Sequence, residues 1–308
     1  MKNLTIENMT KACRGIYHGS DSLLGREAAH VVIDSRKAGP GDVFVAIKGE
    51  RVDGHSFIPG VMEKGALCAV SEQDLGETAF PSIQVESAAQ ALLDIATLYR
   101  DSFDVTVVGI SGSVGKTSTR DMIGAVVASQ YRMLKTEGNY NNDIGLPLTI
   151  LRYRDEEAVV LEMGMNHLGE IDLLSRIANP DIAVITNVGT AHIGNLGSRD
   201  KILEAKMEIV NGLKDNGVLI VNQDNDKLAW MVKHHGKIAY QIKTFGIHQP
   251  ALVQATEIQL GNDGSHFVYA GVRFDIPVPG EHFILNALSA IAVGECLGIP
   301  LEKIQQAL

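Results

Sequence analysis

A glycine-rich turn followed by lysine and threonine is the clearest chemical feature of this sequence. It lies within residues 105–119, VTVVGISGSVGKTST, where an apolar, β-branched run precedes the turn. Gly112 and Gly115 leave room for an anion to approach backbone N–H groups at the start of a helix. Lys116 can then reach the β- and γ-phosphates of a nucleotide, and the Thr117 hydroxyl can bind the Mg²⁺ that bridges them.

The turn is shorter than the full phosphate-loop pattern, because Ile110 stands where the first glycine would be. A short glycine-rich turn between a strand and a helix can also be purely structural. Glu162 favours nucleotide binding, since it ends the apolar run AVVLE, where a carboxylate is costly without a cation or donors. Mg²⁺ at the phosphate loop would be such a cation. The alternative is a carboxylate that caps the next helix.

His192 and Lys206 extend the candidate site. His192 follows an expected strand over 181–188, although a loop histidine is more often a surface residue. Lys206 falls on the apolar stripe of a helix, four residues after Ile202 and three before Ile209. Such a lysine must extend its amine to solvent, pair with an anion or lose its charge. A neutral amine can react with CO₂ to form a carbamate that binds metal, so three interpretations stay open.

Asparagine side chains occur in three further segments that the same site can use. Asn141 and Asn142 lie in the donor-rich loop TEGNYNNDIGLPL, where they can face a phosphate or an acyl group or bond locally within a turn. Asn222 ends the apolar run GVLIVN, and Asn286 lies one helical turn after His282. His282 and Asn286 can therefore both face a planar base or a ribose. Each of these features is weak when taken alone.

The order of the expected elements places these residues at one edge of a sheet. Residues 1–84 are expected to form a small α+β domain, and residues 85–308 a second domain that begins with a helix over 87–99. From residue 104 strands and helices alternate, which predicts an α/β fold with a mostly parallel sheet. Residues 237–278 are expected to form an antiparallel appendage with a hairpin turn. Ligands of such sheets bind beyond the carboxyl ends of the strands.

The boundaries of the expected elements follow from the apolar periodicity. Strands are expected over 104–110, 131–136, 157–162, 181–188 and 217–222. Helices are expected over 116–129, 145–152, 168–177, 198–213, 224–234 and 282–297.

Composition and charge exclude several functional classes. A chain of 308 residues with 45% hydrophobic and 21% charged residues is typical of a soluble protein of two domains. The net charge of −10 argues against nucleic-acid and anionic-membrane partners. Three separated cysteines suggest neither disulfides nor a metal cluster. Because the sequence has neither a signal peptide nor an apolar run of about 20 residues, we expect a cytoplasmic protein without membrane insertion. We also expect a monomer.

Motifs along nearly the whole chain resemble the Mur ligase family. The motifs are DSRKAGPGDVFVAIKGERVDGHSFI at 34–58, GSVGKTS at 112–118, EGNYNNDIGLPLTIL at 137–151, LEMGMNHLGEI at 161–171, TNVGTAHIGNLGS at 186–198, EAKMEI at 204–209, NQDND at 222–226 and GEHFILNALSAIAVG at 280–294. Their form is most similar to the family members that add D-alanyl-D-alanine to UDP-N-acetylmuramoyl-tripeptide. The resemblance therefore implies an ATP-dependent amide ligase of peptidoglycan precursor synthesis, which works through an acyl phosphate.

The resemblance also implies a role for each candidate residue. ATP would bind Gly112, Ser113, Gly115, Lys116, Thr117, Ser118, Asn222 and Asn286. Mg²⁺ at two sites would be held by Thr117, Glu162, His192 and a carbamylated Lys206. The reaction centre would include Lys116, Asn141, Asn142, His192 and Lys206. The UDP-sugar-peptide would be bound in the N-terminal domain by Ser35, Arg36, Asp53, Gly54 and His55.

Two departures from the family pattern limit these expectations. Phe283 stands where many members carry a second asparagine after the histidine. The chain ends at Leu308, about where the C-terminal domain of the family would begin. We therefore expect a fragment that binds nucleotide with ligase activity lost or severely reduced. The alternatives are a nucleotide- or UDP-sugar-binding module without turnover, and a sibling ligase that uses another amine.

Overall fold

The computed structural model describes residues 1–76 and 80–308. Contacts between Cα atoms divide the chain into two compact units, which are described separately. The first unit comprises Met1–Asp104 and Asp143–Arg154, and the second comprises Val105–Asn142 and Asp155–Leu308. This division differs from the boundary expected after residue 84. The helix α3 (Ala88–Arg100) lies in the first unit because its buried face packs on the elements α1, β3 and β4 of that unit.

The first unit is built on a five-stranded sheet of order β1-β5-β4-β3-β2, in which only β1 is antiparallel to its neighbour. The strands are β1 (Ile16–His18), β2 (Val31–Val32), β3 (Val43–Val45), β4 (Cys68–Ser71) and β5 (Ser82–Gln84). The helices are α1 (Ile6–Ala12), η1 (Asp21–Leu23), η2 (Gly54–Phe57), α2 (Ile58–Glu63), α3 and α5 (Gly145–Ile150). Thr5 caps α1, because its hydroxyl accepts the Asn8 N–H.

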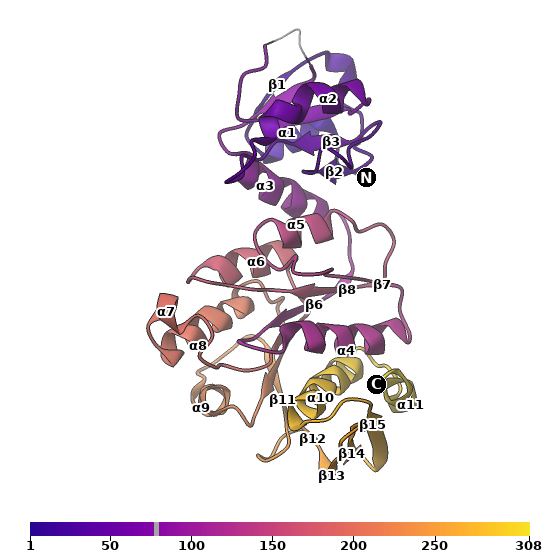
Figure 1. Ribbon diagram of the computed structural model, residues 1–308, viewed down its shortest axis with the longest axis vertical. Helices are drawn as coiled ribbons and strands as arrows, with labels where there is room; N and C mark the ends of the chain where they lie inside the picture. Colours follow the sequence, from indigo (N-terminus) through magenta and orange to yellow (C-terminus); the bar gives the residue numbers. More distant parts are fainter. Residues whose placement is uncertain (77–79) are drawn as a thin grey trace. The chain divides into compact units, whose positions relative to one another are not determined.

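The second unit contains a seven-stranded parallel sheet of order β12-β11-β10-β9-β6-β8-β7 (Figure 1). The strands are β6 (Thr106–Ser111), β7 (Met133–Lys135), β8 (Ala158–Glu162), β9 (Ile182–Ile185), β10 (Val218–Asn222), β11 (Gln241–Gly246) and β12 (Val253–Gln254). The helices are α4 (Lys116–Ala128), α6 (Glu170–Ala178), α7 (Ile193–Leu196), α8 (Arg199–Met207), η3 (Glu208–Asn211), α9 (Asp226–His234), α10 (Glu281–Cys296) and α11 (Leu301–Ala307). The expected α/β fold with a mostly parallel sheet is confirmed.

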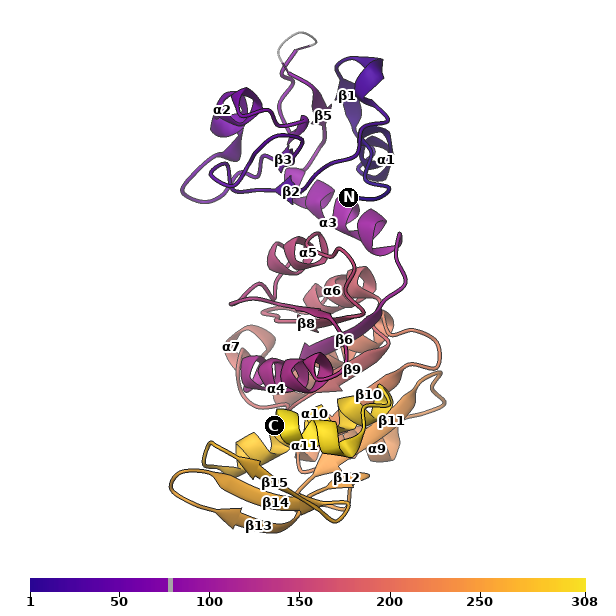
Figure 2. The same ribbon diagram turned by 90° about the vertical axis from the view of Figure 1, so that its right-hand side faces the viewer.

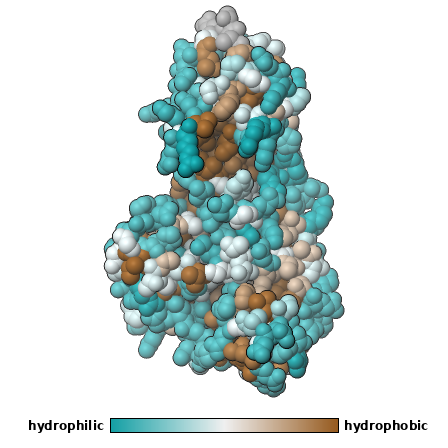
Figure 3. Space-filling model, in the orientation of Figure 1, coloured by the Kyte–Doolittle hydropathy of each residue, from teal (hydrophilic) through white to brown (hydrophobic). Residues whose placement is uncertain are grey.

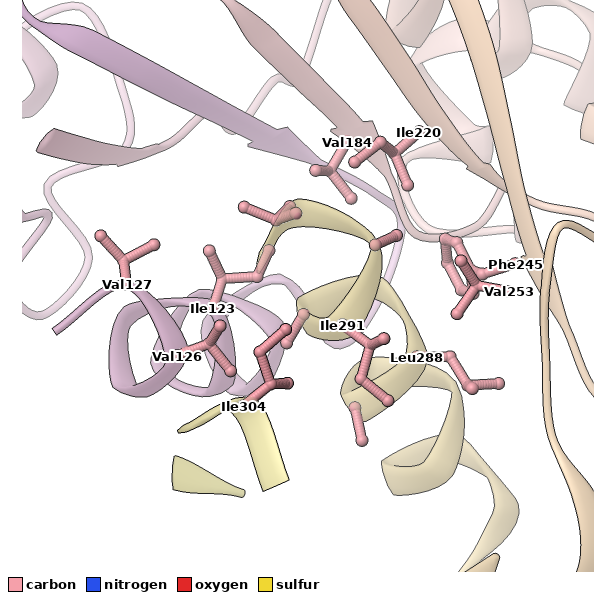
Figure 4. Packing of buried hydrophobic residues seen from close by; sticks show 14 of the residues in the cluster. Ile123, Val126, Val127, Val184, Ile220, Phe245, Val253, Leu288, Ile291 and Ile304 are labelled. Carbon is pink, nitrogen blue, oxygen red and sulfur yellow. The ribbon is translucent and has the colours of Figure 1, made fainter. Parts of the chain in front are cut away.

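The core of the second unit lies between the sheet and the helices α4 and α10, which pack on each other (Figure 4). Ile123 and Val126 of α4 and Ile291 of α10 are fully buried there. Helix α6 lies on the opposite face of the sheet (Figure 1). Burial on both faces explains why β6 and β8 read as nearly continuous apolar runs. The core thus holds the carboxyl ends of β6, β8 and β9 in fixed register.

The antiparallel appendage is smaller than expected. It is a three-stranded sheet of β13 (Thr256–Leu260), β14 (Ser265–Tyr269) and β15 (Val272–Ile276), visible at the lower edge of Figure 2. The expectation that 237–255 also belongs to it is wrong, because β11 and β12 extend the parallel sheet. Side chains of β11 are largely half-buried, which gives the strand the mixed polarity of an appendage rather than of a parallel core strand.

Two further observations concern the chain as a whole. Across residues 1–76 and 80–308, none of the helices combines the length and the apolar character that crossing a bilayer requires. All three cysteines, at positions 13, 68 and 296, are free thiols.

Candidate active site

The phosphate loop connects the central strand β6 to α4. Gly115 precedes the helix with a left-handed φ of 78°, a conformation that glycine adopts without steric strain. The N–H groups of the first turn, from Lys116 onwards, have no acceptor within the helix and can bind an anion. A Cβ on Gly112 would lie 1.9 Å from the Thr186 side-chain oxygen, so the loop has room only for glycine there. Ser113 is buried and Ser118 is half-buried.

The close approach at Gly112 gives a testable prediction. Gly112→Ala should weaken binding of ADP and Mg²⁺, measured by calorimetric titration, because the loop must move to admit the methyl group. Overpacking of this kind costs about 1–3 kcal/mol, or about 5- to 150-fold in Kd if the strain falls on the loop. Gly194→Ala is the matched control, since a Cβ there meets nothing within 4 Å. If both variants bind ADP and Mg²⁺ with equal affinity, the close packing of Gly112 against Thr186 does not affect the nucleotide site.

Lys116 bends back over the loop. Its Nζ donates a hydrogen bond to the Gly112 carbonyl at 3.0 Å. Burial lowers the pKa of Lys116, while the nearby Glu162 carboxylate opposes that shift. A lysine that already lies over the loop has only a short distance to move to reach a phosphate.

Glu162 ends β8 with 2% of its surface exposed. Its Oε2 accepts the Thr117 hydroxyl at 3.1 Å, and its Oε1 accepts the Asn141 side-chain amide at 2.8 Å. The buried Arg120 guanidinium lies 3.5 Å from Oε2. Arg120 was missed in the sequence, although it follows Lys116 by one helical turn on the same side of α4. The expected proximity of Glu162 to the phosphate loop is therefore found, with a positive charge beside it.

The side chains around Glu162 fit a magnesium ion that also contacts phosphates. Mg²⁺ prefers oxygen ligands and is usually held by one or two carboxylates together with substrate phosphates and waters. Glu162 and the Thr117 hydroxyl offer oxygens 3.1 Å apart. In the described part of the chain no group of three or more His, Cys, Asp or Glu side chains is arranged to hold a metal. An ion here would thus depend on the nucleotide for several of its ligands.

Lys206 lies on α8 with 1% of its surface exposed. Ile202 and Ile209 on the same stripe are fully buried, which confirms the expected position of this lysine. Within residues 1–76 and 80–308, no hydrogen bond or ion pair engages its amine. Burial, followed by the positive charge of Lys116, lowers the pKa of Lys206 to about 7. Among the described residues no salt bridge to this amine is found, and the carbamate stays a prediction.

His192 precedes α7 with a φ of 66°, a region that non-glycine residues seldom occupy. Burial lowers the pKa of His192, and the positive charges of Lys206 and Lys116 lower it further. The negative charge of Glu170 raises the pKa of His192 and partly opposes this shift. The structure therefore brings His192 within electrostatic range of both lysines. The Lys116 ammonium and the Arg120 guanidinium, both close to the buried Glu162 carboxylate, make this edge of the sheet suited to a phosphate anion.

The remaining asparagines lie at different distances from the loop. Asn286 on α10 is buried and accepts the Thr119 hydroxyl at 2.9 Å, and its Oδ1 would lie 3.6 Å from a Cβ on Gly115. Asn222 ends β10, two strands away from β6, and its Oδ1 accepts the Asp224 N–H at 2.9 Å. Asn142 is exposed. The structure thus brings Asn286 to the phosphate loop, and contact of either buried asparagine with adenosine remains a prediction.

The residues expected to bind a UDP-sugar lie in two loops of the first unit. Figure 3 shows an apolar area (brown) on this unit with hydrophilic side chains (teal) beside it. Arg36 is 86% exposed along its side chain and pairs with Asp34 at 2.8 Å. The Ser35 carbonyl accepts a hydrogen bond from Lys64. An exposed guanidinium on an ordered turn is available to an anionic group such as a diphosphate.

The second loop, which contains Asp53, Gly54 and His55, also stabilises the structure of the first unit. A Cβ on Gly54 would lie 2.7 Å from the Ile47 carbonyl, so glycine is required there. His55 is 8% exposed, and its Nε2 accepts the Glu72 N–H at 3.0 Å. Its Nδ1 must therefore carry the proton and donate to Asp53 at 2.6 Å. This bond lowers the pKa of Asp53, which stays ionised. His55 thus orients the Asp53 carboxylate, and the imidazole nitrogens are both engaged.

These bonds predict a measurable structural effect. His55→Leu should destabilise the first unit by about 1–3 kcal/mol, because the Glu72 N–H and the Asp53 carboxylate each lose a hydrogen bond to the buried imidazole. Hydrogen-exchange mass spectrometry on peptides from the first unit reports the change in opening free energy. His235→Leu, at an exposed histidine, should leave these peptides unchanged. Unaltered exchange in His55→Leu would contradict the structural role.

Comparisons with known proteins agree with this geometry. Residues 110–294 match the Mur ligase middle domain, and residues 27–100 match the catalytic domain of the Mur ligase family. The UDP-N-acetylmuramoyl-tripeptide–D-alanyl-D-alanine ligase of Bacillus subtilis is 43% identical over 283 residues, which are 90% of this chain and 61% of that protein. The chain thus spans about three fifths of the length of this curated relative.

Solved structures give the same result. The crystal structure of MurF from Acinetobacter baumannii matches with a TM-score of 0.90 at 36% identity, covering 99% of this chain and 67% of that one. MurF ligase from Thermotoga maritima, in complex with ADP, matches with a TM-score of 0.79 at 31% identity, covering 90% of this chain and 65% of that one. Since the middle-domain match alone covers more than half of its residues, the chain belongs to the Mur ligase family.

Proposed function

We propose that this chain carries the nucleotide site and the UDP-sugar-peptide site of an ATP-dependent ligase. The proposed reaction joins D-alanyl-D-alanine to UDP-N-acetylmuramoyl-tripeptide in peptidoglycan precursor synthesis. The observation that carries the proposal is the buried Glu162 bonded to Thr117 of the phosphate loop, in a chain 43% identical to a ligase of that name. In P-loop NTPases an acidic residue and the Ser or Thr of the loop hold the Mg²⁺ that serves phosphoryl transfer.

The proposed chemistry is activation of a carboxylate. A terminal carboxylate oxygen of the tripeptide attacks the γ-phosphorus of ATP, and ADP leaves. The amine of D-alanyl-D-alanine then attacks the acyl carbon, phosphate leaves and the amine loses a proton. The N–H groups at the start of α4 and the Lys116 ammonium would bind the transferred phosphoryl group. To do so, Lys116 exchanges its bond to the Gly112 carbonyl for one to phosphate.

Two magnesium positions are part of the proposal. When bound, Mg²⁺ would neutralise charge on the phosphates and on the departing ADP. Thr117 and Glu162 would hold one ion, and His192 with Lys206 would hold the other. Support comes from the oxygens at Glu162 and from the lack of an anionic partner for the Lys206 amine within the described residues.

A carbamate on Lys206 would supply the missing anion. The neutral amine and CO₂ would form an N-carboxylate and release one proton, which turns a base into an oxygen ligand. Burial of the amine without a hydrogen bond or ion pair, among residues 1–76 and 80–308, supports this modification. The positive groups Lys116 and Arg120 near the site would favour the resulting negative charge.

The other candidate residues take substrate-binding roles in the proposal. Asn286 and Asn222 would contact the adenosine, and Asn141 and Asn142 would line the reaction centre. Support for Asn141 is its bond to Glu162 at 2.8 Å. In the first unit the UDP-sugar would contact Ser35, Arg36, Asp53 and Gly54, with His55 orienting Asp53.

We also propose a monomer that acts in the cytoplasm. The groups at residues 112–117, 162, 192 and 206 all come from one chain, so a second copy is not needed to complete them. Free thiols and the use of ATP suit a reducing compartment. Light scattering across a range of protein concentrations tests the oligomeric state.

Product analysis tests the proposed function. The chain is incubated with ATP, MgCl₂ and UDP-N-acetylmuramoyl-tripeptide, with and without D-alanyl-D-alanine, beside a protein with the full length of the relatives. We expect ADP to form only with the tripeptide, and the full-length protein to form the amide. Glu162→Gln is the control, in which ADP formation should be lost. Amide formation with a different amine favours a sibling ligase, and nucleotide binding without any ADP favours a binding module.

A further inference from the structure

Asn187 follows β9 and makes a two-point hydrogen bond with Val114 of the phosphate loop. Its Oδ1 accepts the Val114 N–H at 3.1 Å, and its Nδ2 donates to the Val114 carbonyl at 2.9 Å. The same Oδ1 and the Asn187 carbonyl both accept the Ser113 N–H at 3.1 Å. One residue at a strand end therefore fixes the peptide groups on both sides of Val114.

The Val114 carbonyl has a second donor at the end of β9. The Thr186 hydroxyl donates to it at 3.1 Å. Two donors from this strand end hold the carbonyl towards β9, although the Val114 side chain is 64% exposed. A carbonyl oxygen carries partial negative charge, so one turned towards a bound phosphate would repel it. The arrangement keeps this oxygen occupied while the first N–H groups of α4 remain without helical acceptors.

We propose that Asn187 is a positioning residue that holds the phosphate loop in its anion-accepting shape before nucleotide arrives. The inference rests on the proposed nucleotide binding. Asn187 acts through Val114 and Ser113 rather than by touching phosphate. A loop that is ordered in advance loses less conformational freedom when nucleotide binds, which strengthens binding.

Two substitutions separate the parts of this role. Asn187→Leu removes both the donor and the acceptor at similar size. Asn187→Asp keeps an acceptor for the N–H groups of Val114 and Ser113, loses the donor to the Val114 carbonyl and places a negative charge beside the loop. Both variants should weaken nucleotide binding, and the aspartate should weaken it more because it also repels phosphate.

The test measures the loop and the ligand separately. Amide hydrogen exchange at Ser113 and Val114 is followed by NMR without nucleotide, and binding of ADP with Mg²⁺ is measured by calorimetry. In Asn187→Leu we expect faster exchange at Val114, whereas the Ser113 N–H keeps the Asn187 carbonyl as an acceptor. We also expect a Kd raised about tenfold, the loss expected when hydrogen bonds that order a binding loop are removed. A residue that only stabilised the fold would lower the unfolding midpoint without changing the Kd of the folded protein.

Asn211 supplies matched controls. It is exposed, and its side-chain amide donates to Asp172. Asn211→Leu and Asn211→Asp should leave the two loop amides and the Kd unchanged. Unchanged exchange at Val114 in Asn187→Leu, or an unchanged Kd, overturns the proposal. If the wild-type chain does not bind ADP, the proposed function fails, and the exchange measurement still decides whether Asn187 holds the loop.

Discussion

Lys116→Met should weaken binding of ADP or ATP by about 10- to 150-fold. The lysine lies over the phosphate loop, and a hydrogen bond to a charged group contributes about 1.5–3 kcal/mol, which gives this range of Kd. Methionine keeps the length and the apolar stem of the side chain, so the loop can keep its packing. Calorimetric titration with and without Mg²⁺ measures the change. If the variant binds nucleotide with wild-type affinity, the Lys116 ammonium does not bind the phosphates.

A second measurement on the same variant checks the geometry without nucleotide. The positive charge of Lys116 lowers the pKa of His192. Removing that charge removes a repulsion, so the pKa of His192 should rise in Lys116→Met. NMR titration of the ring protons reports it. As a control, Lys201→Met replaces a half-exposed lysine of α8 and should leave the pKa unchanged. If the pKa of His192 stays constant in Lys116→Met, the charge of Lys116 has no electrostatic effect on the His192 ring.

Lys206→Met should abolish carbamate formation and greatly reduce ligase turnover. With ¹³C-labelled bicarbonate, the wild-type chain should give a carbamate carbonyl resonance in the ¹³C spectrum that the variant lacks. In a protein with the full length of the relatives, Lys206→Ala should lower the rate by about 10- to 100-fold, as for loss of a group that tunes a metal site. A small added carboxylate should restore part of that rate, because it supplies the missing oxygens.

The control for this prediction comes from the same helix. Lys201 is exposed and pairs with Glu204 at 2.6 Å, so it lacks the buried setting without an ion pair that distinguishes Lys206. Lys201→Met should retain the carbamate resonance. A bare Lys206 ammonium in a crystal structure with magnesium bound beside it would refute the carbamate for that state.

Much of the second unit is predictable because its strands are buried on both faces. Apolar runs such as VTVVGIS and AVVLE leave few alternatives, and the observed strands β6 and β8 lie within one or two residues of the expected ranges. Strands nearer the edge are harder to assign. β11 has half-buried side chains, and β12 has two residues, so neither carries the continuous apolar pattern of a parallel core strand.

The unit boundary was less predictable than the strands. Residues 143–154 lie in the sequence between two segments of the second unit, but they pack in the first unit. There Tyr153 stacks on Phe103 with ring centroids 3.7 Å apart. Periodicity along the chain reports which face of a helix is apolar, and it does not report which unit covers that face. The long-range contact between two aromatic rings is therefore invisible in the sequence.

The candidate site was predictable where a residue conflicts with its surroundings. Lys206 on an apolar stripe and Glu162 at the end of an apolar strand both stand out, and both are buried. Arg120 and Asn187 were not singled out for the site, because arginine on a helix and asparagine at a strand end are ordinary. Their importance comes from partners about 40 and 70 residues away in the chain, which only the fold brings together.

The most direct test of the account is a map of amide chemical-shift changes during titration with ADP and Mg²⁺. We expect the largest changes at Gly115, Lys116 and Thr117, where the loop meets the start of α4, with a smaller change at Asn286. Saturable binding that leaves these amides unshifted would contradict a nucleotide site at this edge of the sheet. So would the absence of any shift at nucleotide concentrations that saturate related ligases.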